Sequence, residues 1–135
     1  MSRSEKPFIV VGVGENLGSI PHHRDVVGIE RILLLSGKLL ASSPIHVAGH
    51  LVTSAGTGAS AEEWKYTEAH VHDCDEVNVV WSESGELVYR IELDGASHLV
   101  RSPSAVFVPA GTRHRAEAVS GRGSFFCILL SPHSK

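Results

Sequence analysis

The sequence predicts a chain built almost entirely from β-strands and folded as one barrel or sandwich. About ten short runs rich in β-branched and other apolar residues recur at regular spacing, with turn-forming residues between them. One separator, Asp94-Gly95, is typical of a tight β-hairpin. Apolar residues make up 42% of the 135 residues, enough for the core of a single domain, and no internal repeat is visible.

The N-terminal residues 1–27 are predicted to form an arm with an edge strand at Pro7–Val13, and residues 28–135 to form the barrel. Gly12-Val13-Gly14 is too short a match for a phosphate-binding loop, because no complete glycine fingerprint follows it. Val26–Leu35 also has helical spacing of its apolar residues. Glycines at both ends of this run favour a strand at Ile29–Leu35 instead.

The remaining strands follow from alternating or continuous apolar runs between turn residues. They are expected at Ile45–Thr53, Glu76–Trp81, Leu87–Leu93, Ser97–Arg101, Ala105–Val108, Arg113–Val119 and Ser124–Leu130. Small residues at Ser54–Ser60 predict a loop over the barrel mouth, and Ala61–Trp64 a short helical turn. Gly121-Arg122-Gly123 is interpreted as a turn that separates the last two strands.

Four residues form the candidate metal site. His70 and His72 lie two apart, so on an extended strand both imidazoles point to the same side. A bend after His72 brings Glu76 towards the same point. His114 follows the rigid turn Pro109-Ala110-Gly111 and completes the set. Three imidazoles and one carboxylate suit one divalent transition metal per chain, with Fe, Mn, Zn, Ni, Co and Cu all left open.

The pattern His-x-His-x3-Glu, followed by Pro-x-Gly-x2-His, resembles the two motifs of the cupin superfamily, over roughly residues 28 to 131. The resemblance implies a double-stranded β-helix, the small antiparallel jelly-roll barrel of cupins, with the metal inside it. The implied ligands are His70, His72, Glu76 and His114. Glycines that flank these motifs in the family are replaced here, whereas all four ligand positions are kept.

Three further residues are candidates for chemistry around the metal. His46 and His50 lie four apart on one predicted strand and share a face. If that face is the inner one, they line the cavity as acid, base or hydrogen-bond donor; otherwise they face solvent or a partner subunit. Asn78 alternates with Glu76, so it is expected to point inward and orient a ligand. His22 and His23 are interpreted as surface residues.

Composition excludes several classes of partner. The formal net charge of −3 provides no basic field for nucleic acid. No run of eighteen apolar residues and no secretory signal is evident, so neither a membrane span nor export is expected. Two distant cysteines, Cys74 and Cys127, fit reduced thiols and a cytoplasmic location. An exposed sheet edge and the family resemblance together predict a homodimer.

The function expected from this pattern is a metal-dependent enzyme acting on a small organic molecule inside the barrel. Dioxygenase chemistry is slightly favoured, because it is frequent among cupins that keep all four ligands. Redox-neutral isomerisation or cyclisation, of the sugar-isomerase or polyketide-cyclase kind, uses the same ligand set. A cupin that binds a small ligand without catalysis is the third alternative.

Overall fold

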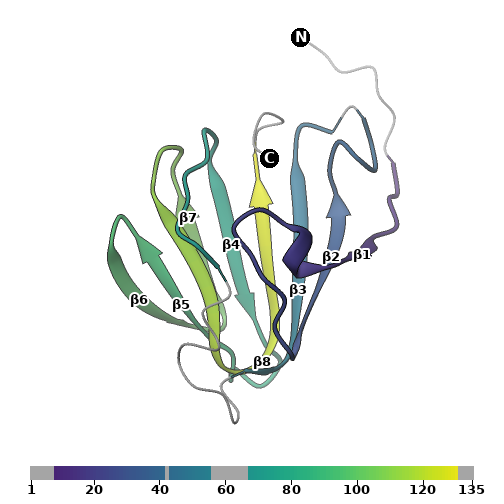
Figure 1. Cartoon of the computed structure of the whole chain (residues 1–135). Coiled ribbons are helices and arrows are strands. Elements are labelled where there is room, and N and C mark those ends of the chain that lie inside the picture. Colours follow the sequence, from purple (N-terminus) through teal and green to yellow (C-terminus); the bar gives the residue numbers. More distant parts are fainter. Residues whose placement is uncertain (1–7, 42, 56–66, 131–135) are drawn as a thin grey trace.

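The computed structural model describes residues 8–41, 43–55 and 67–130, and these residues form strands with one short 3-10 helix (Figure 1). The elements are β1 (Val13–Glu15), η1 (Leu17–Ser19), β2 (Ile29–Leu35), β3 (His46–Ala55), β4 (Glu76–Trp81), β5 (Val88–Leu93), β6 (Ala96–Arg101), β7 (Ser104–Val108) and β8 (His114–Leu129). Most of the loop expected after Ser54, and the helical turn expected at Ala61–Trp64, lie outside the described residues.

Two antiparallel sheets share the long strand β8, which gives the all-β jelly roll expected from the sequence. The C-terminal half of β8 lies between β3 and β4, within the strand order β1-β2-β3-β8-β4-β7. Its N-terminal half pairs with β5, which in turn pairs with β6. Figure 1 shows β5 and β6 on one side and β1, β2 and β3 on the other, with β8 common to both.

The turn expected at Gly121-Arg122-Gly123 is instead the place where β8 bends from one sheet into the other. Both glycines have positive φ, 85° and 155°. A Cβ on Gly121 would lie 2.0 Å from the Glu86 carbonyl oxygen, and one on Gly123 would lie 2.3 Å from that of Trp81. Only glycine permits this close approach, so a sequence signal typical of a turn marks a bend within one strand.

The expected edge strand at Pro7–Val13 is also wrong in position. Residues 8–12 are not in a strand, and the edge strand is β1, which pairs with β2 from Val13 to Glu15. The glycines expected to weaken the strand do not interrupt it, because Gly14 lies within β1. The strands predicted at Ile29–Leu35 and Glu76–Trp81 have the bounds observed for β2 and β4.

The interior has an apolar end and a polar end. The apolar core contains buried residues of β2, β3, β4, β5 and β8. Within it, Tyr89 stacks on Phe125 with ring centroids 4.3 Å apart. Along β4 the inward residues change from Glu76 through Asn78 to Val80, and along β3 from His46 through His50 to Val52. The same alternation therefore builds the core at one end and a polar site at the other.

Among the described residues, no helix is long and apolar enough to span a bilayer.

Candidate metal centre

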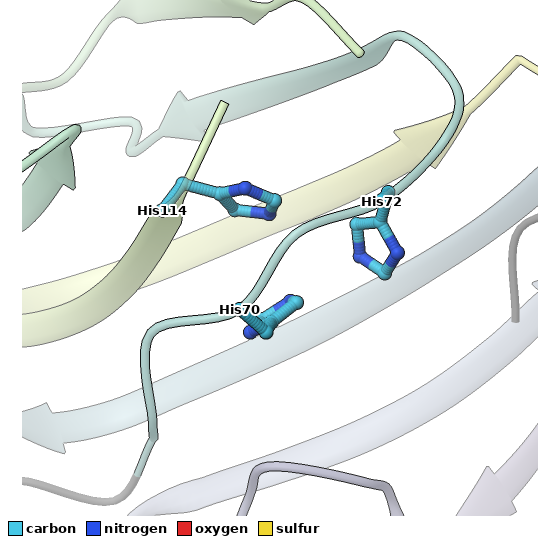
Figure 2. A group of neighbouring side chains, drawn as sticks. All are labelled: His70, His72 and His114. Atoms are coloured by element: carbon cyan, nitrogen blue, oxygen red, sulfur yellow. The ribbon is translucent and has the colours of Figure 1, made fainter. Parts of the chain in front are cut away.

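Three short stretches of backbone hold the four residues expected as metal ligands. His70 and His114 are paired directly, because each backbone N–H donates to the other's carbonyl oxygen at 2.9 and 2.8 Å. Figure 2 shows His70 and His72 along the extended segment before β4, with His114 opposite them at the start of β8. Glu76 is the first residue of β4. The antiparallel bridge thus brings residues 44 positions apart in sequence to the same mouth of the barrel.

The four side chains converge. Metal-binding nitrogen atoms of His70, His72 and His114 lie within 4.8 Å of one another. Glu76 Oε1 is 3.1 Å from His114 Nε2 and 3.6 Å from His72 Nε2. The structure therefore places all four expected residues around one point, with imidazole and carboxylate donors that suit a borderline divalent cation.

Backbone carbonyl groups determine which ring nitrogens carry lone pairs. The Nδ1–H groups of His70 and His114 donate to the carbonyl oxygens of Glu68 and Thr112, each at 2.8 Å. In the neutral ring this leaves the lone pair on Nε2. Such a hydrogen bond on the far nitrogen is the arrangement that orients histidine ligands in metal sites.

Glu76 is likewise oriented by contacts to Oε2, the carboxylate oxygen that does not face the imidazoles. Asn78 Nδ2 donates to Glu76 Oε2 at 2.7 Å, and the Cys127 thiol lies 3.5 Å from the same oxygen. Glu76 Oε1 and His114 Nε2 are buried and have no hydrogen-bond partner in the part of the chain that the structure describes, although they face each other. Two lone pairs in contact repel unless a cation or proton lies between them. These orphaned acceptors fit a bound metal ion.

Burial and mutual contact shift the pKa values of this cluster. Burial lowers the pKa of His70 to about 4, and burial also lowers the pKa of His72. Burial opposes ionisation of Glu76, but His114 and the Asn78 amide outweigh it and lower the pKa of the carboxyl. Burial likewise opposes protonation of His114, but Glu76 and the Thr112 carbonyl raise its pKa. At pH 7 His70 and His72 are thus neutral, as metal binding requires.

These residues line part of a cavity of about 660 Å³, a size typical of small-molecule sites, and this part is called the metal end. The part lined by Arg31, His46 and His50 is called the Arg31 end. His46 and His50 also line the cavity, so their shared face is the inner one. Asn78 does not line it: the side chain is 1% exposed and lies behind Glu76. Asn78 points inward, as expected, but the expectation that it lines the cavity with His46 and His50 is wrong, because its amide contacts the Glu76 carboxylate rather than the open space.

Arg31 is a cavity residue that sequence reasoning missed. It lies on β2 and is 7% exposed. Its guanidinium donates to Glu15 Oε1 at 2.9 Å, to His50 Nε2 at 3.1 Å and, more weakly, towards His46 Nε2 at 3.5 Å. Burial and the neighbouring Arg31 charge lower the pKa of His50 to about 3. A charged residue at an inward position of an apolar strand already indicates such a residue in the sequence, because a buried arginine is almost always paired.

The N-terminal arm also contributes to the cavity. His22 stacks on His70 with ring centroids 4.7 Å apart, and His23 pairs with Thr67 in an antiparallel bridge. The His23 Nδ1–H donates to the Pro21 carbonyl at 2.8 Å, which leaves its Nε2 lone pair free. Both histidines line the cavity. His22 is also exposed, as expected, whereas the partly buried His23 was not expected there. Nothing in an irregular segment predicts which side of it faces a distant barrel.

Comparisons with known proteins agree with this architecture. No family model matches the chain, and no curated protein matches its sequence. Among solved structures, the polyketide cyclase RemF from Streptomyces resistomycificus superposes with a TM-score of 0.59 at 14% identity, covering 99% of this chain and 82% of RemF. A cupin 2 domain-containing protein from Halorhodospira halophila matches with a TM-score of 0.59 at 17% identity, covering 80% and 67%. KdgF from Halomonas sp. matches with a TM-score of 0.54 at 13% identity, covering 93% and 94%.

Proposed function

We propose that this chain, which has the cupin fold, is a metal-dependent enzyme that acts on a small organic molecule by redox-neutral proton transfer, as an isomerase or cyclase does. One observation carries the proposal: three imidazoles and one carboxylate with free lone pairs converge at the end of a cavity that also holds other histidines. His70, His72, Glu76 and His114 are the proposed ligands. A bound divalent ion would polarise a substrate oxygen and lower the pKa of an adjacent proton.

Protein groups beyond the proposed ligands support proton transfer. His23 Nε2 has a free lone pair, and burial lowers the pKa of His23, so the ring is a neutral acceptor at pH 7. His50 accepts a hydrogen bond from Arg31 at Nε2, so its proton is on Nδ1, and this N–H is buried with no partner among residues 8–41, 43–55 and 67–130. His23 could accept a proton from one substrate atom and return it to another, while the His50 N–H could donate a hydrogen bond to a substrate oxygen.

Dioxygenase chemistry is the second candidate, because imidazole and carboxylate ligands also suit iron. The resemblance to a polyketide cyclase concerns the fold alone, but it is consistent with redox-neutral chemistry on this scaffold. A non-catalytic role in binding a small ligand is the third candidate, and it predicts metal and ligand binding without turnover.

Metal content and oxygen uptake test the proposal. Protein purified without chelators should contain about one transition metal ion per chain, and Co2+-loaded protein should show d–d bands typical of nitrogen and oxygen ligands. Glu76→Gln and His72→Ala should lose metal, whereas His98→Ala, an exposed histidine on β6, should retain it.

The reaction class is then tested with α-hydroxyketones and β-ketoacids in D2O. Deuterium incorporation without O2 consumption supports redox-neutral proton transfer. Oxygen uptake by the iron-loaded protein in the presence of such a compound supports the dioxygenase instead. Failure of the protein to bind any divalent metal would contradict all the metal-dependent alternatives.

A further inference from the structure

We propose that the Arg31 end of the cavity is a carboxylate subsite, so that the ligand is a small organic acid held by Arg31 while another of its oxygens reaches the metal end. This inference rests on the proposed function, because it concerns the same cavity. Arg31 and the metal-end residues line a single continuous space. A ligand that spans this space would therefore contact both ends.

Arg31 retains hydrogen-bonding capacity. A guanidinium carries five N–H groups. Contacts to Glu15, His50 and His46 account for three of them, and the last is long at 3.5 Å. Two N–H groups thus have no partner among the described residues. The side chain is 7% exposed, and a buried cation with unpaired donors is costly unless a ligand or water completes it.

The charge balance of the cavity favours an anion. Among the described residues of its lining, Arg31 and Lys38 contribute two positive charges, and Glu15 and Glu76 contribute two negative ones. These cancel, so a divalent metal ion would leave an excess of two positive charges. Lys38 lies 3.9 Å from Glu15 and its side chain is 79% exposed, which places a second cation close to the subsite and accessible to solvent. An anionic ligand compensates for this excess.

A carboxylate matches the site better than a phosphate group. Two N–H groups of one planar guanidinium suit the two coplanar oxygens of a carboxylate. A phosphate group has more oxygens and more charge than the two unpaired N–H groups of Arg31 can satisfy.

Glu15 supplies the control that separates ligand binding from structure. If Arg31 serves only as the partner of Glu15, removing either charge should have similar consequences. If Arg31 binds a carboxylate, Glu15→Gln should maintain or strengthen anion binding, because the competing carboxylate is gone, whereas Arg31→Lys and Arg31→Met should weaken it. Arg101→Met, at an exposed position of β6, matches the change in net charge without touching the cavity.

The experiment uses catechol as a metal-chelating probe on the Zn2+-loaded protein, measured by titration calorimetry. Its affinity is compared with that of 3,4-dihydroxybenzoate, the homologues with one and two methylene spacers, and the corresponding neutral amides. At least one carboxylate should bind about tenfold to a hundredfold more tightly than its amide. Arg31→Met should abolish this preference. Arg31→Lys, which keeps the charge but loses the planar pair of donors, should reduce it, and Glu15→Gln and Arg101→Met should retain it.

The outcomes separate this inference from the proposed function. If catechol binds but no carboxylate is preferred over its amide, the subsite is wrong while the metal centre stands. Equal loss of the preference in Glu15→Gln and the Arg31 variants also overturns it. If catechol does not bind to the Zn2+-loaded protein, benzoate against benzamide on the metal-free protein decides the subsite alone, and the metal analysis described above decides the proposed function. If the Arg31 variants do not fold, the carboxylate–amide comparison on the wild-type chain still decides the matter.

Discussion

The two ends of the cavity use the same residue type for opposite purposes. At the metal end, His70 and His114 donate from Nδ1 to backbone carbonyls and keep Nε2 free. At the Arg31 end, Arg31 approaches Nε2 of His50 and His46, so the lone pairs are already in use. What a histidine can do is therefore decided by its hydrogen-bond partner. Carbonyl partners prepare the ring to bind a cation, and a guanidinium partner turns it into a neutral donor.

The two buried carboxylates of Glu117 and Glu76 also differ in how their hydrogen-bonding capacity is used. Glu117 receives hydrogen bonds from Arg90, Arg115 and the Thr67 backbone N–H, so both of its oxygens are satisfied. Glu76 receives donors on Oε2 only, and Oε1 is left facing two imidazoles. A fully paired carboxylate stabilises the fold, whereas a half-paired one retains the capacity to bind a cation.

The largest expected effect is at the metal end. His114→Ala removes a proposed ligand and should lower the affinity for Zn2+ by more than about a hundredfold, above the usual effect of losing an outer-sphere partner. Competition with a chromophoric chelator measures this. His46→Ala, at the Arg31 end, should leave Zn2+ affinity unchanged. Wild-type affinity and stoichiometry in His114→Ala would remove the distinction between the two ends.

The second effect concerns the two carboxylates. Glu117→Gln leaves two arginines without their partner and should lower the free energy of unfolding by about 2–3 kcal/mol, less than for fully buried pairs because both arginines are partly exposed. Urea denaturation with and without Zn2+ measures this, and stabilisation by the metal should persist. Glu76→Gln should instead abolish that stabilisation. The exposed control Glu30→Gln should change neither. If Glu117→Gln abolished the stabilisation by Zn2+ and Glu76→Gln did not, the contrast between the two carboxylates would be contradicted.

The third effect is a pH dependence at the Arg31 end. The pKa of His50 is about 3 in the folded chain, against 6.5 when unperturbed. Between these values the unfolded chain binds a proton that the folded chain does not, so stability is lost as pH falls through this window. From pH 6.5 to about pH 5, His50 alone should cost about 2 kcal/mol. Urea denaturation of the wild type and His50→Gln measures it: the variant should show a shallower loss, and parallel pH profiles would contradict the assignment.

The smallest effect tests the support behind Glu76. Asn78→Ala removes the closer donor to Oε2 and should lower Zn2+ affinity by about tenfold. Cys127→Ala removes the longer contact, so it should have a smaller effect. An Asn78→Ala protein that is destabilised but binds Zn2+ as tightly as the wild type would limit Asn78 to a role in the core.

Much of the fold was predictable from local pattern, because strand alternation and turn residues act over a few positions. β2 and β4 have their predicted bounds, and the fold class is confirmed by the strands and the solved cupin structures. Gly121 and Gly123 are typical of a turn in sequence, but glycine permits both a turn and a close backbone approach. The choice depends on Glu86 and Trp81, which are distant in sequence.

For the site, the sequence by itself determined that two imidazoles share a side and that a carboxylate and a third imidazole lie in reach of them. The bridge between His70 and His114, the orphaned lone pairs and the place of Arg31 beside His50 were decided by the tertiary structure. Spacing along a strand specifies which way a side chain points. The partner that it meets there comes from another strand, and that partner determines its protonation state and its chemistry.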